Sequence, residues 1–271
     1  MIRKLGIMPY AGGDTRFIRT ILKLLPKGEL FVEPFGGSGV VSIACAYYGK
    51  YPRIILNDLD YYIYSIYYVV KYKPDIIDRV GKILNHWASL PKEKFHDLKR
   101  EVLLPIRNML QNGYDGPIER VGFYNLLLHY ASVSPYTTGI MIRWVDNPNR
   151  YKHVGDKLRR IHKIMKKVEI SNKDAFELMR ELDSSETVFY VDPPHLDKNL
   201  YRLNFERRDA IELAKLMCSL QGKVLAKFSP TDKVVVDMLV NNGWRISQLL
   251  EYRRMMSANK TMTQYYFVSN Y

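Results

Sequence analysis

Short runs of apolar residues alternate with longer runs of mixed apolar and polar residues along most of this chain. An apolar run of about four to eight residues between turn residues predicts a buried strand, whereas apolar residues at helical spacing predict a helix with one buried face. By these criteria, strands are predicted within residues 29–35, 53–58, 167–172, 186–194, 223–229, 244–254 and 261–271.

Helices are predicted between these strands, and their placement indicates how the strands are connected. A strand, a glycine-rich turn, a helix and a second strand follow one another within residues 29–58, and such a βαβ unit implies parallel strands. The last two runs predict a closing antiparallel pair. The predicted fold class is α/β, a Rossmann-like doubly wound, mostly parallel sheet with a terminal antiparallel strand. The helices are predicted at 40–50, 61–72, 74–90, 174–182, 207–220 and 231–243.

The alternation is interrupted between about residues 61 and 150. Helical stretches there give way to a Tyr/Asn/Pro/Gly-rich stretch from Gln111 to Asn149 that we expect to be irregular. This pattern indicates a mainly helical insertion into the sheet domain. We therefore predict a discontinuous domain of residues 1–64 and 150–271, with an inserted domain of residues 65–149.

Composition and charge narrow the classes of function. The 271 residues are 47% hydrophobic and 25% charged, and no long apolar run or signal peptide is evident, so we expect a soluble, cytoplasmic protein without membrane association. The two cysteines, Cys45 and Cys218, argue against a disulfide scaffold or a cysteine zinc site. The net charge of +13 favours a polyanionic partner, although a membrane surface or solubility alone fits it equally.

The stretch FVEPFGGSGV, residues 31–40, has the composition of a strand that ends in a ligand-binding turn. Glycines let a backbone approach a ligand closely, and the helix that follows offers free N–H groups. The stretch matches neither the full dinucleotide fingerprint nor a Walker loop. Asp58, at the end of the second strand, is placed to accept hydrogen bonds from ribose hydroxyls. NAD and S-adenosylmethionine fit this pattern equally well.

A second stretch, VFYVDPPH at residues 188–195, brings Asp192 to the carboxyl edge of the sheet, where open α/β folds bind ligands. Pro193 and Pro194 fix the backbone and lack N–H donors, which leaves their carbonyls free to accept. A carboxylate, a rigid carbonyl and the ring of His195 suit an exocyclic amino group on an aromatic base. The alternative is a proline turn that closes the strand.

Taken together, these motifs resemble those of the Dam-type DNA adenine-N6 methyltransferases. The likeness extends from PYAGGD (9–14) through FVEPFGGSG, LNDLD (56–60), SNKDAF (171–176) and VFYVDPPH to the terminal QYYFVSNY. It implies S-adenosylmethionine as the cofactor and double-stranded DNA as the substrate. Asp192 and the Pro193 carbonyl would accept the two hydrogens of an adenine amine that has left the duplex, and positioning and electrostatics would supply the catalysis.

The resemblance also assigns residues to the site. The implied catalytic group is Asp192, Pro193, Pro194 and His195. The implied cofactor-binding residues are Tyr10, Ala11, Gly12, Gly13, Glu33, Phe35, Gly36, Gly37, Ser38, Gly39, Asp58, Asp174, Ala175, Phe176 and Asp192.

Two positions depart from the family pattern. The family usually has a lysine after Gly-Gly, where this chain has Asp14, so Arg16 or Lys4 would have to supply the positive charge. The family has a tyrosine after the two prolines, where this chain has His195. A histidine ring stacks over less area and changes character on protonation. Tyr201 is the alternative stacking residue.

The inserted domain is expected to read the DNA sequence, with Arg143 as one candidate contact. The basic segment 149–167, which includes Arg150 and Lys152, predicts phosphate contact, although a solvated helix face fits it equally. No spacing of metal ligands is evident, so no metal is expected. A partner restriction endonuclease fits the family, and monomer and dimer both remain open.

Three other functions remain open. One is a cofactor- and DNA-binding homologue with little or no activity, favoured by His195 and Asp14. Another applies the same chemistry to RNA or to cytosine N4, because exocyclic amines present the same hydrogens. The third is an NAD-dependent oxidoreductase, which follows from the glycine turn alone and leaves DPPH unexplained.

Overall fold

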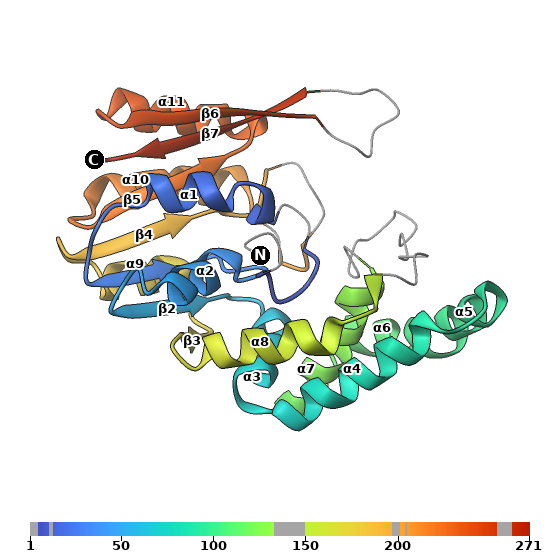
Figure 1. The fold of residues 1–271 in the computed structure, drawn as a ribbon. Coiled ribbons are helices and arrows are strands. Elements are labelled where there is room, and N and C mark those ends of the chain that lie inside the picture. The colour runs from blue at the N-terminus through green and yellow to red at the C-terminus, as the bar shows by residue number, and fades with distance from the viewer. Residues whose placement is uncertain (1–4, 11–12, 133–149, 197–200, 204, 254–261) are drawn as a thin grey trace.

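The computed structural model describes residues 5–10, 13–132, 150–196, 201–203, 205–253 and 262–271. It contains a seven-stranded sheet in the order β3-β2-β1-β4-β5-β7-β6 (Figure 1). Neighbouring strands are parallel except around β7, which runs antiparallel to both β5 and β6. The predicted fold class is therefore confirmed. The strands are β1 (Leu30–Glu33), β2 (Arg53–Asn57), β3 (Glu169–Ser171), β4 (Thr187–Val191), β5 (Lys223–Phe228), β6 (Arg245–Arg253) and β7 (Met262–Ser269).

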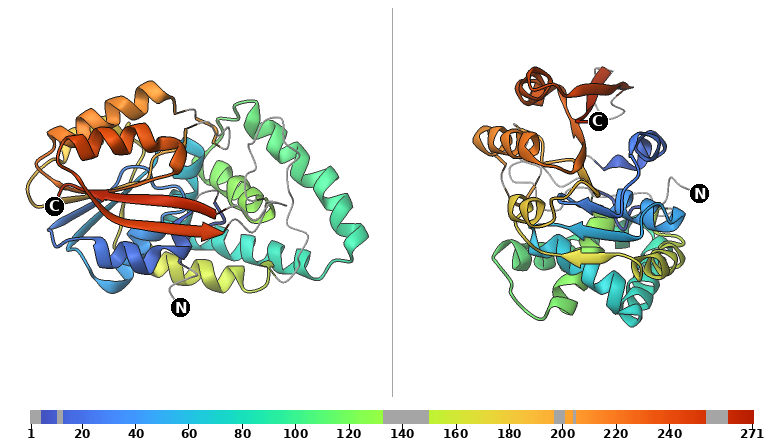
Figure 2. Two further views of the ribbon diagram at one scale, coloured as in Figure 1. Left: turned by 90° about the horizontal axis from the view of Figure 1, so that it is seen from above. Right: turned by 90° about the vertical axis from the view of Figure 1, so that its left-hand side faces the viewer.

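The sheet separates two hydrophobic cores, because successive side chains of a strand point to opposite faces. In β4, Val188 and Tyr190 belong to one core, while Phe189 and Val191 belong to the other. Helices α1 and α2 cover the first face, and helices α9, α10 and α11 cover the second (Figure 2). The sheet is thus doubly wound. These helices are α1 (Ile18–Leu24), α2 (Val40–Tyr48), α9 (Ala175–Glu181), α10 (Arg207–Ser219) and α11 (Lys233–Asn241).

A group of helices extends from the β3 edge of the sheet (Figure 1). Helix α3 packs against α7, and α4 packs against α8. Helix α3 runs continuously through the predicted domain boundary between residues 64 and 65. The division of the chain into two domains stays a prediction. The helices are α3 (Tyr61–Tyr72), α4 (Pro74–Ala88), α5 (Lys92–Leu98), α6 (Leu104–Gln111), α7 (Ile118–Ala131) and α8 (Val154–Met165), with a π-helical turn, Lys99–Leu103, between α5 and α6.

One expectation about this region was wrong. The stretch 111–149 was expected to be irregular, yet it contains α7. Nearly every side of α7 is buried from Val121 onward, so its sequence lacks the polar face that makes a helix recognisable. Its Gly122 lies directly against the backbone of Ser65 in α3, which accounts for a glycine within the helix.

The structure also adds the 3₁₀ turn Asp14–Arg16 and the helix α1 after it. Together they bring Asp14 into the interior beside the sheet, where it is 4% exposed. Within the described part of the chain, no helix combines the length and the apolar character needed to cross a membrane.

Candidate active site

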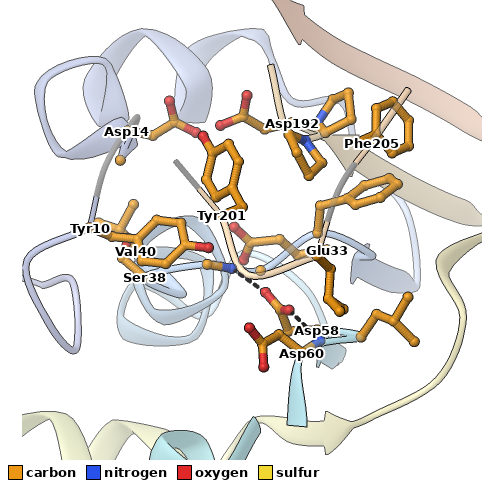
Figure 3. Close-up of a pocket in the computed structure, with 18 residues that line it drawn as sticks. Tyr10, Asp14, Glu33, Ser38, Val40, Asp58, Asp60, Asp192, Tyr201 and Phe205 are labelled. Carbon is orange, nitrogen blue, oxygen red and sulfur yellow. Dashed lines mark hydrogen bonds between the residues drawn. The ribbon is translucent and has the colours of Figure 1, made fainter. Parts of the chain in front are cut away.

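An open pocket of about 850 Å³ lies at the carboxyl ends of β1, β2 and β4 (Figure 3). This is the edge at which open α/β sheets bind ligands. The pocket brings together the glycine turn after β1, the acidic end of β2 and the proline pair after β4. Its lining residues are Tyr10, Gly13, Asp14, Glu33, Phe35, Gly36, Gly37, Ser38, Val40, Asp58, Leu59, Asp60, Asp192, Pro193, Pro194, Tyr201, Leu203 and Phe205.

The glycine turn forms one wall of the pocket and depends on the absence of side chains. Gly37 has φ of +50°, and a Cβ there would lie 2.8 Å from the Tyr10 ring. A Cβ on Gly36 would lie 2.4 Å from Leu56 Cδ1. The turn then leads into α2, whose first residues offer backbone N–H groups near the pocket. Only glycine fits these two positions, because any side chain would meet packed neighbours.

Asp58 ties the end of β2 to this turn. Its Oδ2 accepts the N–H of Gly37 at 2.9 Å, and its Oδ1 accepts the N–H of Asp60 at 2.9 Å. Burial and the neighbouring Asp60 raise the pKa of Asp58 to about 7, although the two N–H donors and Arg202 oppose the shift. Each oxygen keeps one further lone pair, so Asp58 still has acceptor capacity toward the pocket.

Glu33 lies at the end of β1, between Asp58 and Asp192 in the pocket (Figure 3), and is only 3% exposed. Its Oε2 accepts hydrogen bonds from the backbone N–H of Ser42, at 2.8 Å, and from the Ser42 hydroxyl. Burial raises the pKa of Glu33 to about 8 despite these two donors. No ion pair to Glu33 is present among the described residues, and a positively charged ligand would stabilise such a buried carboxylate.

Asp192, Pro193 and Pro194 line the pocket from the end of β4. His195 does not line it: the side chain is 5% exposed, and its Nδ1 lies 3.7 Å from Asp232 Oδ2, behind the pocket wall. The Asp232 carboxylate also accepts the backbone N–H of Leu196. The structure therefore brings Asp192 to the pocket and turns the ring of His195 toward the interior.

A buried lysine lies directly behind Asp192, and sequence reasoning did not identify it. Lys227 of β5 is 1% exposed, and its Nζ donates to Asp192 Oδ2 at 2.8 Å and to Asp14 Oδ1. Of the two residues expected to supply this charge, Arg16 is exposed and Lys4 lies outside the described residues. The available signal was a lysine inside the apolar run 223–229.

The segment after the proline pair brings further residues to the pocket, namely Tyr201, Leu203 and Phe205. The Tyr201 ring centroid lies 6.0 Å from that of Tyr10. Arg202, which lies between Tyr201 and Leu203, donates to Asp60 Oδ1 at 2.9 Å and joins this segment to the end of β2. Tyr201 and Phe205 are thus aromatic residues after DPPH that line the pocket.

Several other predicted residues do not line the pocket. Asp174 caps helix α9, where its Oδ1 accepts the N–H groups of Phe176 and Glu177, and Ala175 is buried. Arg150 and Lys152 are exposed just before α8. Gly39 is the N-cap of α2 and is not among the lining residues. Ala11, Gly12 and Arg143 lie outside the described residues.

The basic segment 149–167 folds largely into α8. Its apolar residues Val154, Leu158, Ile161 and Met165 are buried at helical spacing, and its charged residues face outward. Arg159 donates to Asp78 of α4 at 2.7 Å. Both the solvated helix face and the phosphate contact therefore fit this arrangement. Among the described residues, no group of His, Cys, Asp or Glu could hold a metal ion.

The lining of the pocket suits a cationic ligand with a nucleoside. Five carboxylates line it, and Lys227 contacts two of them; the others are Glu33, Asp58 and Asp60. Aromatic and aliphatic side chains from Phe35, Leu59 and Phe205 provide apolar surface beside these acids. Such a combination is suited to a ligand that carries a flat base, a ribose and a positive charge.

Comparison with known proteins agrees with this chemistry. The family described as D12 class N6 adenine-specific DNA methyltransferase matches residues 10–255. The chain is 26% identical over 269 residues to the Type II methyltransferase M.MjaIII of Methanocaldococcus jannaschii, and the alignment covers 91% of each chain. It is 30% identical over 101 residues to a DNA adenine methylase of Salmonella typhi (37% of this chain, 35% of that protein). It is 35% identical over 75 residues to the DNA adenine methylase of Escherichia coli K12 (28% and 26%).

Proposed function

The chain belongs to the D12 class N6 adenine-specific DNA methyltransferase family, and from this premise we propose that it transfers a methyl group from S-adenosylmethionine to the N6 amine of adenine in double-stranded DNA. The observation that carries the proposal is the position of Asp192, which lines the same pocket as the glycine turn and Asp58. A nucleoside cofactor and an amine acceptor would therefore meet in one cavity.

Residues of three strand ends would hold the cofactor. Asp58 would accept hydrogen bonds from the ribose hydroxyls, and Glu33 would face the positively charged methionine end. Leu59 and Phe35 would contact the adenine ring. S-adenosylmethionine, when bound, supplies a methyl group on a cationic sulfur. Asp174 and Phe176 do not line the pocket, and Asp174 caps α9. We therefore propose that they affect the cofactor through the position of this helix.

Asp192 and the Pro193 carbonyl would accept the two hydrogens of the target amine. This raises the electron density on the nitrogen, whose lone pair forms the new N–C bond as the S–C bond breaks. The methylated nitrogen then loses one proton, for which Asp192 is the nearest base. Burial and the neighbouring Asp14 raise the pKa of Asp192 well above its usual value, although Lys227 opposes the shift, and a raised pKa favours such a proton transfer.

The target adenine would have to leave the duplex to reach this pocket. We assign the stacking contact with the extruded base to Tyr201, because its side chain lines the pocket while His195 faces Asp232. Residues 65–149 would read the sequence as an inserted domain, and the basic segment at 149–167, with Arg150 and Lys152, would contact phosphates. The relationship to a Type II methyltransferase supports a partner restriction endonuclease, and we propose that the protein acts in the cytoplasm.

The test incubates the protein with S-adenosylmethionine and unmethylated duplex DNA and measures N6-methyladenine by mass spectrometry. Parallel reactions contain RNA, or measure N4-methylcytosine, and Asp192→Asn serves as the inactive control. N6-methyladenine in duplex DNA, lost in Asp192→Asn, is the expected result. Base-resolution mapping of the modified adenines then gives the recognition sequence.

Three results would contradict the proposal. Methylation of RNA or of cytosine alone would assign the same chemistry to another substrate. Cofactor and DNA binding without any methylated base would indicate an inactive homologue, and a preference for NAD over S-adenosylmethionine in a binding assay would indicate an oxidoreductase.

A further inference from the structure

Four polar side chains form a buried cluster behind the pocket, from the 3₁₀ turn 14–16, β4 and β5. The Lys227 ammonium contacts Asp14 Oδ1 and, at 2.8 Å, Asp192 Oδ2. Tyr190 Oη donates to Asp14 Oδ2 at 2.6 Å. Asp14 thus has both oxygens occupied inside the protein, whereas these contacts engage only one oxygen of Asp192.

Burying a lysine beside the sheet is costly unless carboxylates compensate its charge. Burial by itself would lower the pKa of Lys227, but Asp14 and then Asp192 raise it above its usual value. The ammonium therefore stays charged throughout the physiological range. Its charge also lies close to the Phe17 and Tyr265 rings, at 5.9 and 5.4 Å from their centroids, and such aromatic faces stabilise a cation further.

The placement of these contacts suggests a role beyond stability. Asp192 is the residue assigned above to the target amine, and an amine hydrogen needs an ionised oxygen that points into the pocket. Because Lys227 holds the Asp192 carboxylate by Oδ2, rotation of the carboxylate is restricted and Oδ1 keeps one direction. A charged neighbour 2.8 Å away also favours the ionised form.

We propose that Lys227 is a positioning residue of the methyl transfer, which holds Asp192 by Oδ2, favours its ionised form and leaves Oδ1 for the target amine, while Asp14 holds the lysine in place. This role rests on the proposed function. Lys227 touches neither substrate nor cofactor and acts through Asp192 alone. The cluster supplies from β5 the positive charge that the chain lacks at position 14.

A structural salt bridge would produce the same contacts, so the test needs readouts that stability alone does not change. Lys227→Met alone would leave two carboxylates facing one another. We therefore compare Asp14→Asn with Asp14→Asn/Lys227→Met, in which Asp14 carries no charge in either variant. Lys223→Met, at the half-buried first residue of the same strand, is the control for loss of a lysine from β5.

Three measurements are made on each protein, namely the single-turnover rate of adenine methylation across pH 5 to 9, S-adenosylmethionine affinity and thermal unfolding. The rate of the double variant should fall by about 100-fold relative to Asp14→Asn, the size typical of one lost electrostatic contact in an active site. Cofactor affinity should change by less than about threefold, since Lys227 does not line the pocket.

The acidic limb of the rate profile should move in one direction from wild type to Asp14→Asn, and in the opposite direction from Asp14→Asn to the double variant. Groups that face Asp192 are Asp14, Lys227, Glu33, Tyr10, Tyr190 and Tyr201. Removing the Asp14 charge favours ionisation of Asp192, so the acidic limb should move to lower pH in Asp14→Asn. Removing Lys227 as well disfavours ionisation, so the limb should move to higher pH in the double variant.

Equal rates and superimposed pH profiles for the two variants would overturn the role of Lys227 while leaving the methyltransferase activity intact. If the double variant does not fold, the profile of Asp14→Asn still decides, because an unchanged or raised acidic limb contradicts the proposal. Absence of methylation by the wild-type protein overturns the proposed function and the role of Lys227 with it.

Discussion

Glu33 provides a direct test of how the pocket receives a cationic cofactor. Its pKa is about 8 in the cofactor-free protein, raised chiefly by burial. At pH 7 about one molecule in ten then has this carboxyl ionised, and ionising the rest costs about 1.4 kcal/mol; at pH 6 the cost is about 2.7 kcal/mol. A bound ammonium or sulfonium favours the ionised form, so binding of S-adenosylmethionine should release a proton below pH 8.

The expected consequence is a pH-dependent affinity. The dissociation constant should fall by about ninefold between pH 6 and 7 and by about fivefold between pH 7 and 8, because the cost of ionisation disappears as Glu33 titrates. Asp58, with a pKa of about 7, should steepen the dependence below pH 7. Above pH 8 the amino group of the cofactor itself loses its proton, at a pKa of about 7.8, and the affinity should fall again.

Isothermal titration of S-adenosylmethionine in two buffers of different ionisation enthalpy measures both the affinity and the protons released. Glu33→Gln keeps the size of the side chain and an acceptor for the Ser42 donors, but it cannot ionise. This variant should bind more weakly at pH 8 and show a flatter dependence, with about one proton fewer released near pH 7. Glu212→Gln, exposed on α10, is the matched control. The same steep dependence in Glu33→Gln, or a flat one in wild type, would refute the reasoning.

Three further variants test other parts of the site. Gly37→Ala places a Cβ 2.8 Å from the Tyr10 ring and should weaken cofactor binding at least about tenfold, whereas Gly49→Ala, also at positive φ but with nothing within 4 Å, should cost only about 1–2 kcal/mol of stability. Tyr201→Ala should lower the methylation rate and the 2-aminopurine fluorescence change that reports base extrusion, and Tyr201→Phe should retain both; equal losses would exclude stacking. His195→Ala should lower the unfolding free energy by about 1–3 kcal/mol with cofactor affinity unchanged, as calorimetry and titration would show.

The sequence was sufficient for the sheet and for most of the pocket. Strands are recognisable in the sequence as short runs in which residues are all apolar or alternate between apolar and polar. Because the carboxyl ends of parallel strands share one edge of the sheet, the glycine turn, Asp58 and Asp192 were expected to meet there. Helix α7 was not recognisable because nearly all of its sides are buried. Asp174 illustrates a different limit, because an acid before a helix can cap that helix as readily as it can bind a ligand, and here its Oδ1 caps α9.

His195 shows why a motif does not fix the direction of its last side chain. A residue after two prolines can face either side of the chain, and the outcome depends on which partner lies within reach. Here Asp232, fixed by the N–H and hydroxyl of Ser229, lies 3.7 Å from the imidazole. An imidazole gains more from a buried carboxylate than from an open pocket, which is why we assign the proposed stacking contact to Tyr201.

Asp14 and Lys227 lead to a related conclusion about charge. A family motif describes a residue type at a sequence position, but an active carboxylate responds only to a charge at a point in space. Lys227 reaches Asp192 from β5, and Asp14, at the position where the family usually has a lysine, holds the ammonium in place. An aspartate at position 14 therefore predicts a buried lysine elsewhere in the cluster. Exchanging the charges with Asp14→Lys/Lys227→Met should restore much of the rate that Asp14→Asn/Lys227→Met loses, and failure to do so would show that the β5 position itself is required.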